Sequence, residues 1–321
     1  MPMHATPSSA RPIRSALRIP RTALLLLFSL SALQPFSLFA ETLTVAPYNV
    51  QNYLSASRVV EGTFQKQYPK PETEKTALRA VIKALNADII ALQEMGNRPH
   101  LTELCRDLEH DGAAYPHAEL LESPGDPDRH LAILSRRPFT VVRKHTDLTF
   151  KYFNTTATVK RGLLEARVAT DAGELTLFIV HLKSRIAERD DDPEAARRRN
   201  SEAEAIRDRI LKTFPDPSAP GALFLILGDF NDTRASRPLR AIGQRGKIQI
   251  ATPLRGGDSR GEIWTYFYSR QDTYSRFDHI LVSPALQKFV QNNSVTIYDG
   301  KNTTTASDHR PVTVRLTLGK K

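Results

Sequence analysis

The residues best suited to catalysis in this sequence follow an apolar run. Residues 223–227 are all apolar, and Gly228, Asp229 and Asn231 come within the next four positions. A continuous apolar run of this length is typical of a strand buried on both faces, and a glycine lets the chain turn sharply where the strand leaves the sheet. We therefore expect Asp229 and Asn231 to lie at the rim of a sheet.

Four other polar side chains stand at the ends of predicted strands. Glu94 and His181 follow apolar runs, whereas Asp278 and His309 precede them. In a sheet with antiparallel strands, the end of one strand adjoins the start of its neighbour, so one rim can collect all of these residues. Each residue alone also fits an ordinary polar strand end or turn. Their number, rather than any one of them, favours a site.

The chemistry of this set points to a metal ion. Two carboxylates within about 4 Å repel by roughly 4 kcal/mol at an effective dielectric constant of 20, so a rim that holds Glu94, Asp229 and Asp308 calls for a cation. Carboxylate oxygens and the amide oxygen of Asn49 suit Mg²⁺ or Mn²⁺ better than zinc. A metal ion beside two histidines suits phosphoryl chemistry, because the ion neutralises phosphate oxygens while imidazoles move protons near neutral pH.

The chain segments that must position these residues are predicted to be a mixture of strands and helices. Helical periodicity over 78–85 predicts an amphipathic helix that ends at Asn86, and Asp192 with Pro193 predicts the start of an arginine-rich helix. Strands are predicted at 43–46, 88–92, 131–134, 161–168, 175–180, 223–227, 263–268, 278–282 and 312–318. This order indicates an α/β protein with more sheet than one parallel layer.

The first forty residues form a separate segment. They contain four arginines and no acidic residue, and these precede an apolar run at 23–33 that is broken by Gln34 and Pro35. This pattern predicts a signal peptide, 1–40, that is cleaved after Ala40. Leu38 is large for the cleavage signal, so an uncleaved membrane anchor remains the alternative. We expect residues 41–321 to form one catalytic domain that is periplasmic or secreted and acts as a monomer.

Composition favours an anionic partner. The chain of 321 residues carries a formal charge of +10, and loss of the four N-terminal arginines leaves about +6. A basic protein favours nucleic acid, phosphorylated metabolites or anionic lipids. The single cysteine, Cys105, excludes an intramolecular disulfide framework, and its leucine neighbours indicate a core position and not a nucleophile.

The motifs taken together resemble a known family. They occur in that family's order as PYNVQN, LQEM, VHLKS, GDFND, FDHIL and SDHRPV, and they span nearly all of residues 41–321. The sequence resembles the endonuclease/exonuclease/phosphatase superfamily, whose members are similar to pancreatic deoxyribonuclease. The resemblance implies a four-layer α/β/β/α sandwich of two packed mixed β-sheets flanked by helices, with metal-dependent cleavage of phosphate esters at one end.

The resemblance also implies a metal-binding set. Glu94 would be the principal ligand of Mg²⁺ or Mn²⁺, and Asn49 and Asp308 would be nearby ligands or supports through water. Apart from the resemblance, the acidic loop Asp190 to Asp192 is interpreted as a loop and helix cap, with calcium as an additional candidate ion there.

A catalytic role follows from the resemblance for five further residues. His309 would be the base or the group that positions water, and Asp278 would hold its imidazole. Asp229 and Asn231 would orient the nucleophile and bind a phosphate oxygen. His181 would act on the side of the leaving group or stabilise charge in the transition state.

Two departures from the family pattern narrow the set of expected substrates. Gln51 stands where apurinic-site endonucleases have an acid, and His181 stands where they lack histidine, so abasic-site repair is disfavoured. Lys183 in HLKS is similar to exported bacterial nucleases, which makes DNA or RNA the expected substrate. A sphingomyelinase-like or inositol-phosphate phosphatase-like activity on a phospholipid or a phosphorylated small molecule is the first alternative. A catalytically silent binding module on the same fold is the second.

Three weaker features have ordinary explanations. A solvated helix face is the favoured interpretation of the arginines at 197–199, 207 and 209, with attraction of a polyanion as the alternative. The aromatic segment 264–268 is predicted to be a packed strand, although its rings also suit stacking on bases or insertion into lipid. Asp232 is interpreted as a turn residue.

Overall fold

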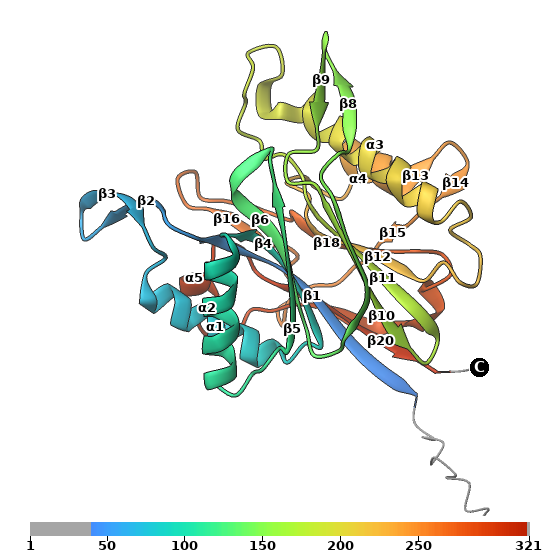
Figure 1. The fold of residues 1–321 in the computed structure, drawn as a ribbon, viewed down its shortest axis with the longest axis horizontal. Helices are drawn as coiled ribbons and strands as arrows, with labels where there is room; N and C mark the ends of the chain where they lie inside the picture. Colours follow the sequence, from blue (N-terminus) through green and yellow to red (C-terminus); the bar gives the residue numbers. More distant parts are fainter. Residues whose placement is uncertain (1–39, 320–321) are drawn as a thin grey trace, which may run out of the picture. The chain divides into compact units, whose positions relative to one another are not determined.

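Two six-stranded mixed sheets lie at the centre of the protein, which is described here from a computed structural model covering residues 40–319, apart from the side chains of residues 292 and 293 (Figure 1). The strand order of the first sheet is β19 (Val290–Ile297), β20 (Val312–Leu318), β1 (Glu41–Tyr53), β4 (Ile89–Met95), β6 (Asp126–Ser135) and β5 (His117–Ser123). Strands β1 and β4 are parallel, and the other neighbours are antiparallel.

The second sheet has a similar pattern. Its strand order is β15 (Thr252–Pro253), β18 (Asp278–Val282), β12 (Phe224–Asp229), β11 (Gly173–His181), β10 (Leu163–Thr170) and β7 (Phe139–His145). Here β11 and β12 are parallel, and the remaining pairs are antiparallel.

Helices cover the outer faces of the two sheets. Figure 1 shows α1 (Glu72–Leu85) and α2 (Arg98–His110) on one side and α3 (Ala196–Thr213) and α4 (Arg237–Gly243) on the other. The short helix α5 (Thr303–Ala306) contributes Ala306 to the apolar cluster beneath α1 and α2. The predicted four-layer α/β/β/α sandwich is therefore confirmed.

The apolar run at residues 223–227, most of which lies in β12, shows how the layers are held together. Leu225 and Leu227 face the core between the sheets, whereas Phe224 and Ile226 face the cluster beneath α3 and α4. Side chains alternate across a strand, so β12 buries both of its faces, as the unbroken run predicts. Full burial of one such side chain stabilises the fold by about 1.5–3 kcal/mol.

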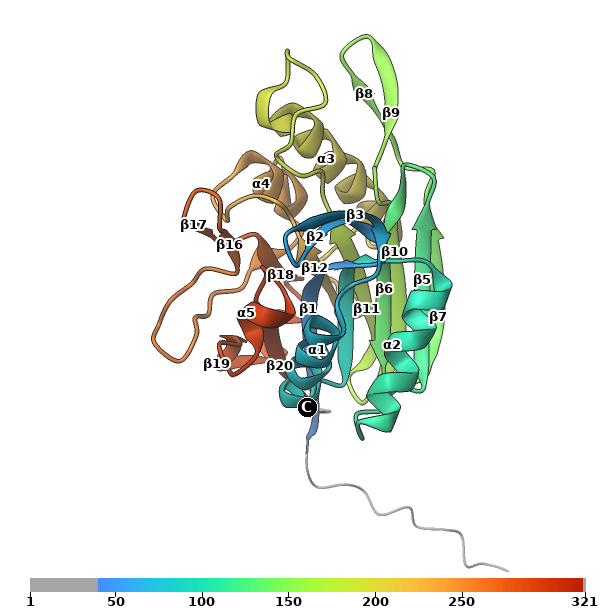
Figure 2. The same cartoon turned by 90° about the vertical axis from the view of Figure 1, so that its left-hand side faces the viewer.

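Four two-stranded hairpins project from the sandwich or border it. They are β2 (Ala56–Val60) with β3 (Thr63–Tyr68), β8 (Thr149–Tyr152) with β9 (Thr155–Thr158), β13 (Gln244–Arg245) with β14 (Ile248–Gln249), and β16 (Tyr266–Tyr268) with β17 (Thr273–Ser275). Figure 2 shows the β8–β9 hairpin extending beyond the sheets. Two 3₁₀ turns, Pro193–Ala195 and Gln287–Phe289, complete the described elements.

Most sequence expectations for the elements are confirmed, with shifts at their ends. Asn86 ends α1 in a left-handed conformation, with φ at 45°. Helix α3 begins at Ala196 and not at Pro193, because Glu194 and Ala195 have positive φ values. Asp192 still serves this helix, since its carboxylate accepts the backbone N–H groups of Arg197 and Arg198 at 2.9 and 3.0 Å.

Two expectations need correction. The predicted strand at 263–268 shortens to Tyr266–Tyr268 and belongs to a hairpin outside the main sheets. Arg199 does not lie on a solvated face, because it is 1% exposed and its Nε donates to Oδ2 of Asp232 at 3.0 Å. Asp232 is therefore an ion-pair partner as well as a turn residue.

Other expectations concern the ends of the chain and its cysteine. The predicted signal peptide falls outside the described residues, of which Ala40 is the first. In the part of the chain that the structure describes, no helix is long and apolar enough to cross a membrane. Cys105 packs partly buried beside the cluster of α1 and α2, and burial raises the pKa of its thiol to about 11.

Candidate active site

Strand pairing across both sheets brings the predicted site residues together. His181 lies opposite Asp229 in the β11–β12 pair, and Asp229 lies opposite Asp278 in the β12–β18 pair. The amide of Asn49 on β1 reaches across from the first sheet and donates to Oδ2 of Asp229 at 3.0 Å. One end of the sandwich therefore holds residues from both sheets.

Asp229 lies at the centre of this cluster. Its Oδ1 accepts the backbone N–H of Asn231 at 2.7 Å. Its Oδ2 lies 3.5 Å from Nε2 of His181 and 3.9 Å from Nε2 of His309. Burial raises the pKa of Asp229 against the lowering effect of His309, and the nearby Asp278 raises it further. A carboxyl whose pKa is raised by burial can accept a proton near neutral pH.

Asp278 fixes the ring of His309. Nδ1 of His309 lies 2.8 Å from Oδ2 of Asp278, and both side chains are buried. Burial alone would lower the pKa of His309, but Asp278, together with Asp229 and Asp308, outweighs it and raises the pKa to about 10. Without a bound cation, the imidazole is therefore charged at neutral pH, and its Nε2 lies 3.9 Å from Oδ2 of Asp229.

Residues that the sequence analysis did not assign to the site also hold His309. The hydroxyl of Ser307 donates to the carbonyl of Asn49 at 2.8 Å and accepts the backbone N–H of His309 at 3.0 Å. The ring of Tyr266 lies 4.7 Å from the imidazole, centroid to centroid. Thr265 accepts the backbone N–H of Asp278 at 3.0 Å. Ser307 belongs to the motif SDHRPV, so its position beside the histidine was a usable signal.

His181 differs from His309 in its charge. It is buried, and burial together with the charges of Arg161 and His309 holds its pKa well below the ordinary value of 6.5. Its Nδ1 has no hydrogen-bond partner among the described residues. His181 is therefore a neutral imidazole at pH 7, and it can bind a substrate oxygen but cannot supply a positive charge.

Glu94 and Asp308 form the acidic part of the site. Glu94 adopts a left-handed conformation, with φ at 61°, and its Oε2 accepts the backbone N–H of Asn52 at 3.0 Å. It lies within β4, one residue before the end, and not after the strand as predicted. Burial raises the pKa of Asp308, and the negative charge of Glu94 adds to this against the effect of His309.

These acids fit a hard divalent cation. Among residues 40–319, no three side chains of His, Cys, Asp or Glu are grouped closely enough to hold a metal ion by themselves. Oδ1 of Asn49 accepts the backbone N–H of Gln51 at 3.0 Å and retains one lone pair. A cation at Glu94 and Asp308 would thus complete its shell with Asn49, water or phosphate oxygens. Mg²⁺ is commonly bound in this way.

The position of Asp229 at the end of β12 depends on Gly228. Gly228 has φ at 141°, and a Cβ atom at this position would lie 2.0 Å from the carbonyl oxygen of Val180. No other residue fits this close approach of β11 and β12 without movement of the backbone. The expected sharp turn at Gly228 is wrong, because Gly228 lies inside β12 and pairs with Val180 and His279; its role is to allow the close approach of the strands.

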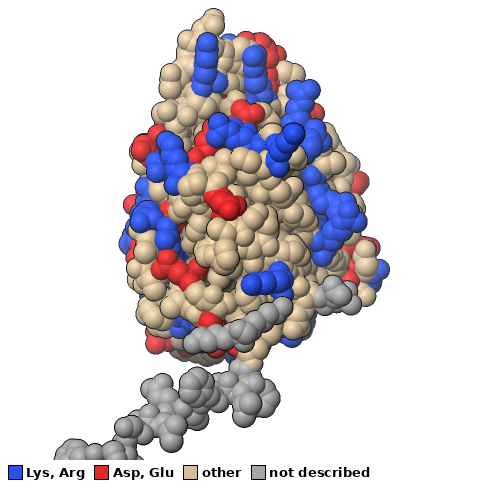
Figure 3. Space-filling view, turned by 90° about the vertical axis from the view of Figure 1, so that its right-hand side faces the viewer, with Lys and Arg blue, Asp and Glu red and all other residues tan. Residues whose placement is uncertain are grey.

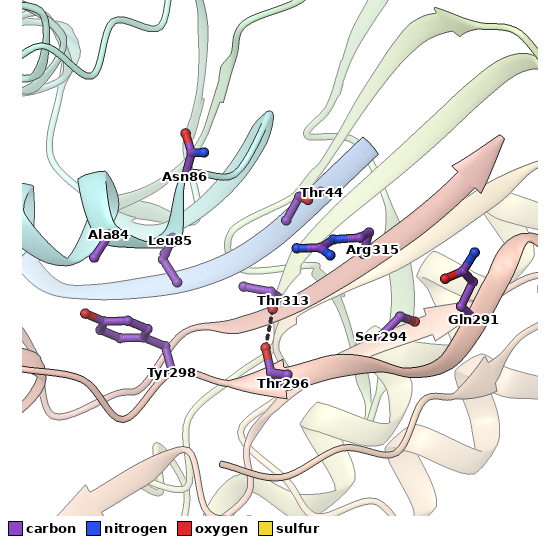
Figure 4. Close-up of a pocket in the computed structure, with 10 residues that line it drawn as sticks. All are labelled: Thr44, Ala84, Leu85, Asn86, Gln291, Ser294, Thr296, Tyr298, Thr313 and Arg315. Carbon is purple, nitrogen blue, oxygen red and sulfur yellow. Dashed lines mark hydrogen bonds between the residues drawn. The ribbon is translucent and has the colours of Figure 1, made fainter. Parts of the chain in front are cut away.

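A large cavity in the protein lies apart from this cluster. Figure 4 shows it between the C-terminal end of α1 and strands β1, β19 and β20, where it has a volume of about 660 Å³. It is lined by Thr44, Asn86 and Arg315 among others, and by none of the predicted site residues.

The fold and the site together define a phosphoester hydrolase of the α/β/β/α sandwich class. Residues 48–309 match the sequence profile described as the Endonuclease/Exonuclease/phosphatase family, and the chain belongs to this family. Family members hydrolyse phosphate esters and generally use divalent metal ions. A sequence comparison with curated proteins returned no significant match.

Solved structures share the fold at low sequence identity. An endonuclease/exonuclease/phosphatase from Bacteroides vulgatus is 14% identical with a TM-score of 0.59, and the match covers 87% of this chain and 99% of that one. Truncated TDP2 from Caenorhabditis elegans is 17% identical with a TM-score of 0.56, over 86% of this chain and 97% of its own. The human Nocturnin catalytic domain, with a bound sulfate, is 14% identical with a TM-score of 0.56, over 85% and 93%. These identities show a shared fold alone.

Proposed function

We propose that the protein is a divalent-metal-dependent phosphodiesterase that hydrolyses DNA or RNA. The observation that carries the proposal is the pair of Asp229 and His309. Oδ2 of Asp229 lies 3.9 Å from Nε2 of His309, at the end of the sandwich that also holds Glu94 and Asp308. A proton acceptor, an imidazolium and an acidic metal-binding pair are the parts that phosphodiester hydrolysis requires.

Each side chain has a defined task in this proposal. A water molecule that contacts both Asp229 and His309 attacks the phosphorus atom, and its proton passes to Asp229. The bond between phosphorus and the leaving oxygen breaks, and the leaving oxygen keeps the bonding electron pair and takes up a proton from solvent water. His309 donates Nε2–H to a phosphate oxygen, and Asn231 and His181 bind the same group. Glu94 and Asp308 would hold a divalent cation, which would supply positive charge to neutralise the phosphate oxygens.

Two substitutions test these tasks. His309→Ala should lower kcat by roughly 10²- to 10⁴-fold with an unchanged circular dichroism spectrum, because it removes a group that contacts the attacking water and the reacting phosphate. Glu94→Gln should raise the Mg²⁺ concentration that gives half the maximal rate. His110→Ala is the matched control, since His110 is 90% exposed on α2 and should behave like wild type. Near-normal hydrolysis by His309→Ala would overturn its assigned role.

A substrate screen tests the proposed function as a whole. Purified residues 41–321 should hydrolyse plasmid DNA or RNA with Mg²⁺ and lose this activity with a chelator. Hydrolysis of sphingomyelin or phosphoinositides with no action on nucleic acid would reject the nuclease. No hydrolysis of any of these esters at any metal concentration would favour a silent binding module.

One observation favours a phospholipid as the second candidate substrate. The β2–β3 hairpin, which extends away from the two sheets in Figure 1, places Val59 opposite Phe64, and the two are 71% and 61% exposed. Arg58 joins this hairpin to the segment that contacts Glu94, because its guanidinium donates to the carbonyl of Asn52 at 2.5 Å and the backbone N–H of Asn52 donates to Glu94. An exposed apolar hairpin near a phosphoesterase site suits contact with a lipid surface. Phe64→Ser should then reduce binding to liposomes and leave hydrolysis of nucleic acid unchanged.

Export is part of the proposal. Basic side chains gather along both edges of the face drawn in Figure 3, and the chain without residues 1–40 keeps a charge of about +6. Such a charge suits an extracellular or periplasmic enzyme that meets free polyanions. Mass spectrometry of the periplasmic and secreted fractions should find a chain that starts at Glu41. Recovery of the uncleaved chain in the membrane fraction would instead support an anchor.

A further inference from the structure

A second cavity opens beside the candidate active site. It has a volume of about 710 Å³ and lies between the segment that follows β12 and the β16–β17 hairpin. Its lining includes Thr233, two residues after Asn231, and Arg276, two residues before Asp278. Two residues of extended chain span about 7 Å, so the cavity begins next to the site.

Aromatic rings form part of the lining of this cavity, with Tyr274 exposed and Trp264 half-buried. Trp264 and Tyr274 have ring centroids 4.8 Å apart, and the guanidinium of Arg310 lies 3.8 Å from the Trp264 ring centroid. Tyr274 is 57% exposed and the neighbouring Ile263 is 60% exposed. Rings that are held on one side and open on the other are suited to stacking on a planar ligand, and each stacked base contributes about 1–3 kcal/mol.

Arginines also line this cavity. Arg234, Arg255 and Arg276 all contribute to the cavity, and within residues 40–319 none of the three pairs with a carboxylate. Asp258 also lines it but is already paired, since its Oδ2 lies 3.1 Å from a guanidinium nitrogen of Arg310. Burial and the charge of Arg234 both lower the pKa of Arg276. The lining therefore concentrates positive charge that the described side chains do not neutralise.

The basic surface continues away from the site. A smaller cavity of about 380 Å³ shares Arg234 and Arg255 with the first one and adds Arg240 on α4. The side chain of Arg240 donates only to a backbone carbonyl, that of Ala235, among the described residues. Figure 2 shows α4 and the β16–β17 hairpin on the same side of the sandwich. We call this path, from Arg276 through Arg234 and Arg255 to Arg240, the arginine groove.

We propose that the arginine groove binds the backbone phosphates of a single-stranded polynucleotide that extends from the scissile phosphate, while an unpaired base stacks on Trp264 and Tyr274. The charge of the groove matches a chain of phosphates, and stacking needs a base that is free of its partner strand. A small phosphomonoester would leave most of the groove unused. The inference deepens the proposed function and rests on it for the identity of the ligand.

The experiment compares a long ligand with a short one. The variants are Arg234→Gln with Arg255→Gln, and Tyr274→Ala. Arg315→Gln is the matched control, because this exposed arginine lines the separate 660 Å³ cavity and likewise has no carboxylate partner within residues 40–319. The substrates are a single-stranded oligonucleotide of about 20 residues and the p-nitrophenyl ester of thymidine 5′-monophosphate, which has one phosphodiester and no further phosphates.

The double variant should lose about 10-fold or more in kcat/KM on the oligonucleotide and keep the wild-type value on the short ester. The slope of log affinity against log salt should fall by about 1.4, since each lost phosphate contact contributes about 0.7 for a single strand. Tyr274→Ala should weaken oligonucleotide binding without changing this slope. Arg315→Gln should match wild type on both substrates.

A binding measurement separates this inference from the proposed function. Fluorescence anisotropy with a labelled oligonucleotide in a chelator reports the groove without any hydrolysis. Weaker binding by the double variant supports the groove. If wild type binds the oligonucleotide but cleaves no nucleic acid, only the proposed nuclease activity is rejected, and the groove is not. Equal binding by wild type and the double variant overturns the groove. Binding to anionic phosphatidylglycerol vesicles that depends on Arg234 and Arg255, with no oligonucleotide binding, also overturns it in favour of a lipid.

Discussion

At the scale of single residues, the charge of His309 is set by its neighbours. The free imidazole has a pKa of 6.5, and the carboxylates around the buried ring raise this value to about 10. A folded-state pKa above the unfolded value stabilises the protein fully below about pH 6.5, and this contribution is lost as the pH rises through about 10. The same carboxylates keep the imidazolium in place for a phosphate.

Asp278→Asn tests this dependence directly. The amide cannot supply the negative charge that lies 2.8 Å from Nδ1, so the pKa of His309 should fall. In metal-free protein, an NMR titration of the imidazole should show a lower midpoint, and kcat should fall by about 10- to 1,000-fold in the presence of Mg²⁺.

Asp272→Asn is the control for this experiment. Asp272 is exposed between β16 and β17 in a left-handed conformation that asparagine adopts readily. The substitution removes the same charge without touching His309. An unchanged midpoint in Asp278→Asn would show that other groups set the charge of the imidazole.

The sequence predicted only in part which residues come together at this end of the sandwich, and it did not predict their contacts. Asn49 and Asp308 were found because their motifs are short and local. The central position of Asp229 was not predictable, since it depends on β1 and β12 meeting across two sheets. Tyr266 was interpreted as part of a packed strand, because an aromatic run has the same pattern whether its rings face a core or a histidine. The catalytic roles themselves stay predictions.

At the scale of elements, the exit of β12 depends on one glycine. A Cβ atom at position 228 would lie 2.0 Å from the carbonyl oxygen of Val180. Gly228→Ala should therefore separate β11 from β12, displace Asp229 and lower both thermal stability and kcat. The expected loss of stability is about 2–4 kcal/mol, measured by denaturant unfolding.

Gly221→Ala provides the comparison for Gly228→Ala. Gly221 lies just before the same strand, and a Cβ atom there meets nothing within 4 Å. This variant should keep the wild-type stability and activity. Equal effects of the two substitutions would mean that the close approach at Gly228 does not position Asp229.

Helix α3 is joined to the site turn by a buried ion pair. Arg199 donates to Asp232 at 3.0 Å and, through NH1, to the carbonyl of Glu194 at 2.9 Å. Arg199→Ala leaves the buried carboxylate of Asp232 with Arg185, 3.1 Å from Oδ1, as its remaining arginine partner, and should cost about 1–3 kcal/mol of stability. Arg209→Ala is the matched control on the same helix, since Arg209 forms a contact of 4.0 Å with the exposed Asp147.

Unfolding in urea would measure both variants of α3. A loss below 1 kcal/mol for Arg199→Ala, similar to that of a surface pair, would contradict the assigned role. The sequence could not reveal this pair, because an arginine in a run of arginines has the composition of a solvated face. Only the packing of α3 against the turn at Asp232 distinguishes Arg199 from its neighbours.

At the scale of the whole molecule, the sequence predicted the strands and helices that form the four layers. It did not predict the hairpins that project from them or the arginine groove. Unbroken apolar runs such as that of β12 predict strands buried on both faces, and an apolar stripe on α1 predicts a covering helix. The hairpins β2–β3 and β8–β9 carry few apolar residues and depend on turns that the pattern does not reveal. The arginine groove depends on segments from residue 233 to residue 276 that meet only in the folded chain.

The separation of the core from the site predicts the effect of metal removal. The apolar cluster between the sheets contains neither Glu94 nor Asp308, so the fold does not depend on a cation for its core. A chelator should abolish hydrolysis and leave the circular dichroism spectrum unchanged.

Added Mg²⁺ should raise the melting temperature, because an ion that binds only the folded state stabilises it by about 2.7 kcal/mol at 100 times its Kd. Glu94→Gln should reduce this rise, whereas Glu109→Gln, at an exposed position on α2, should not. A melting temperature that does not respond to Mg²⁺, together with full activity in the chelator, would exclude the metal site at Glu94 and Asp308.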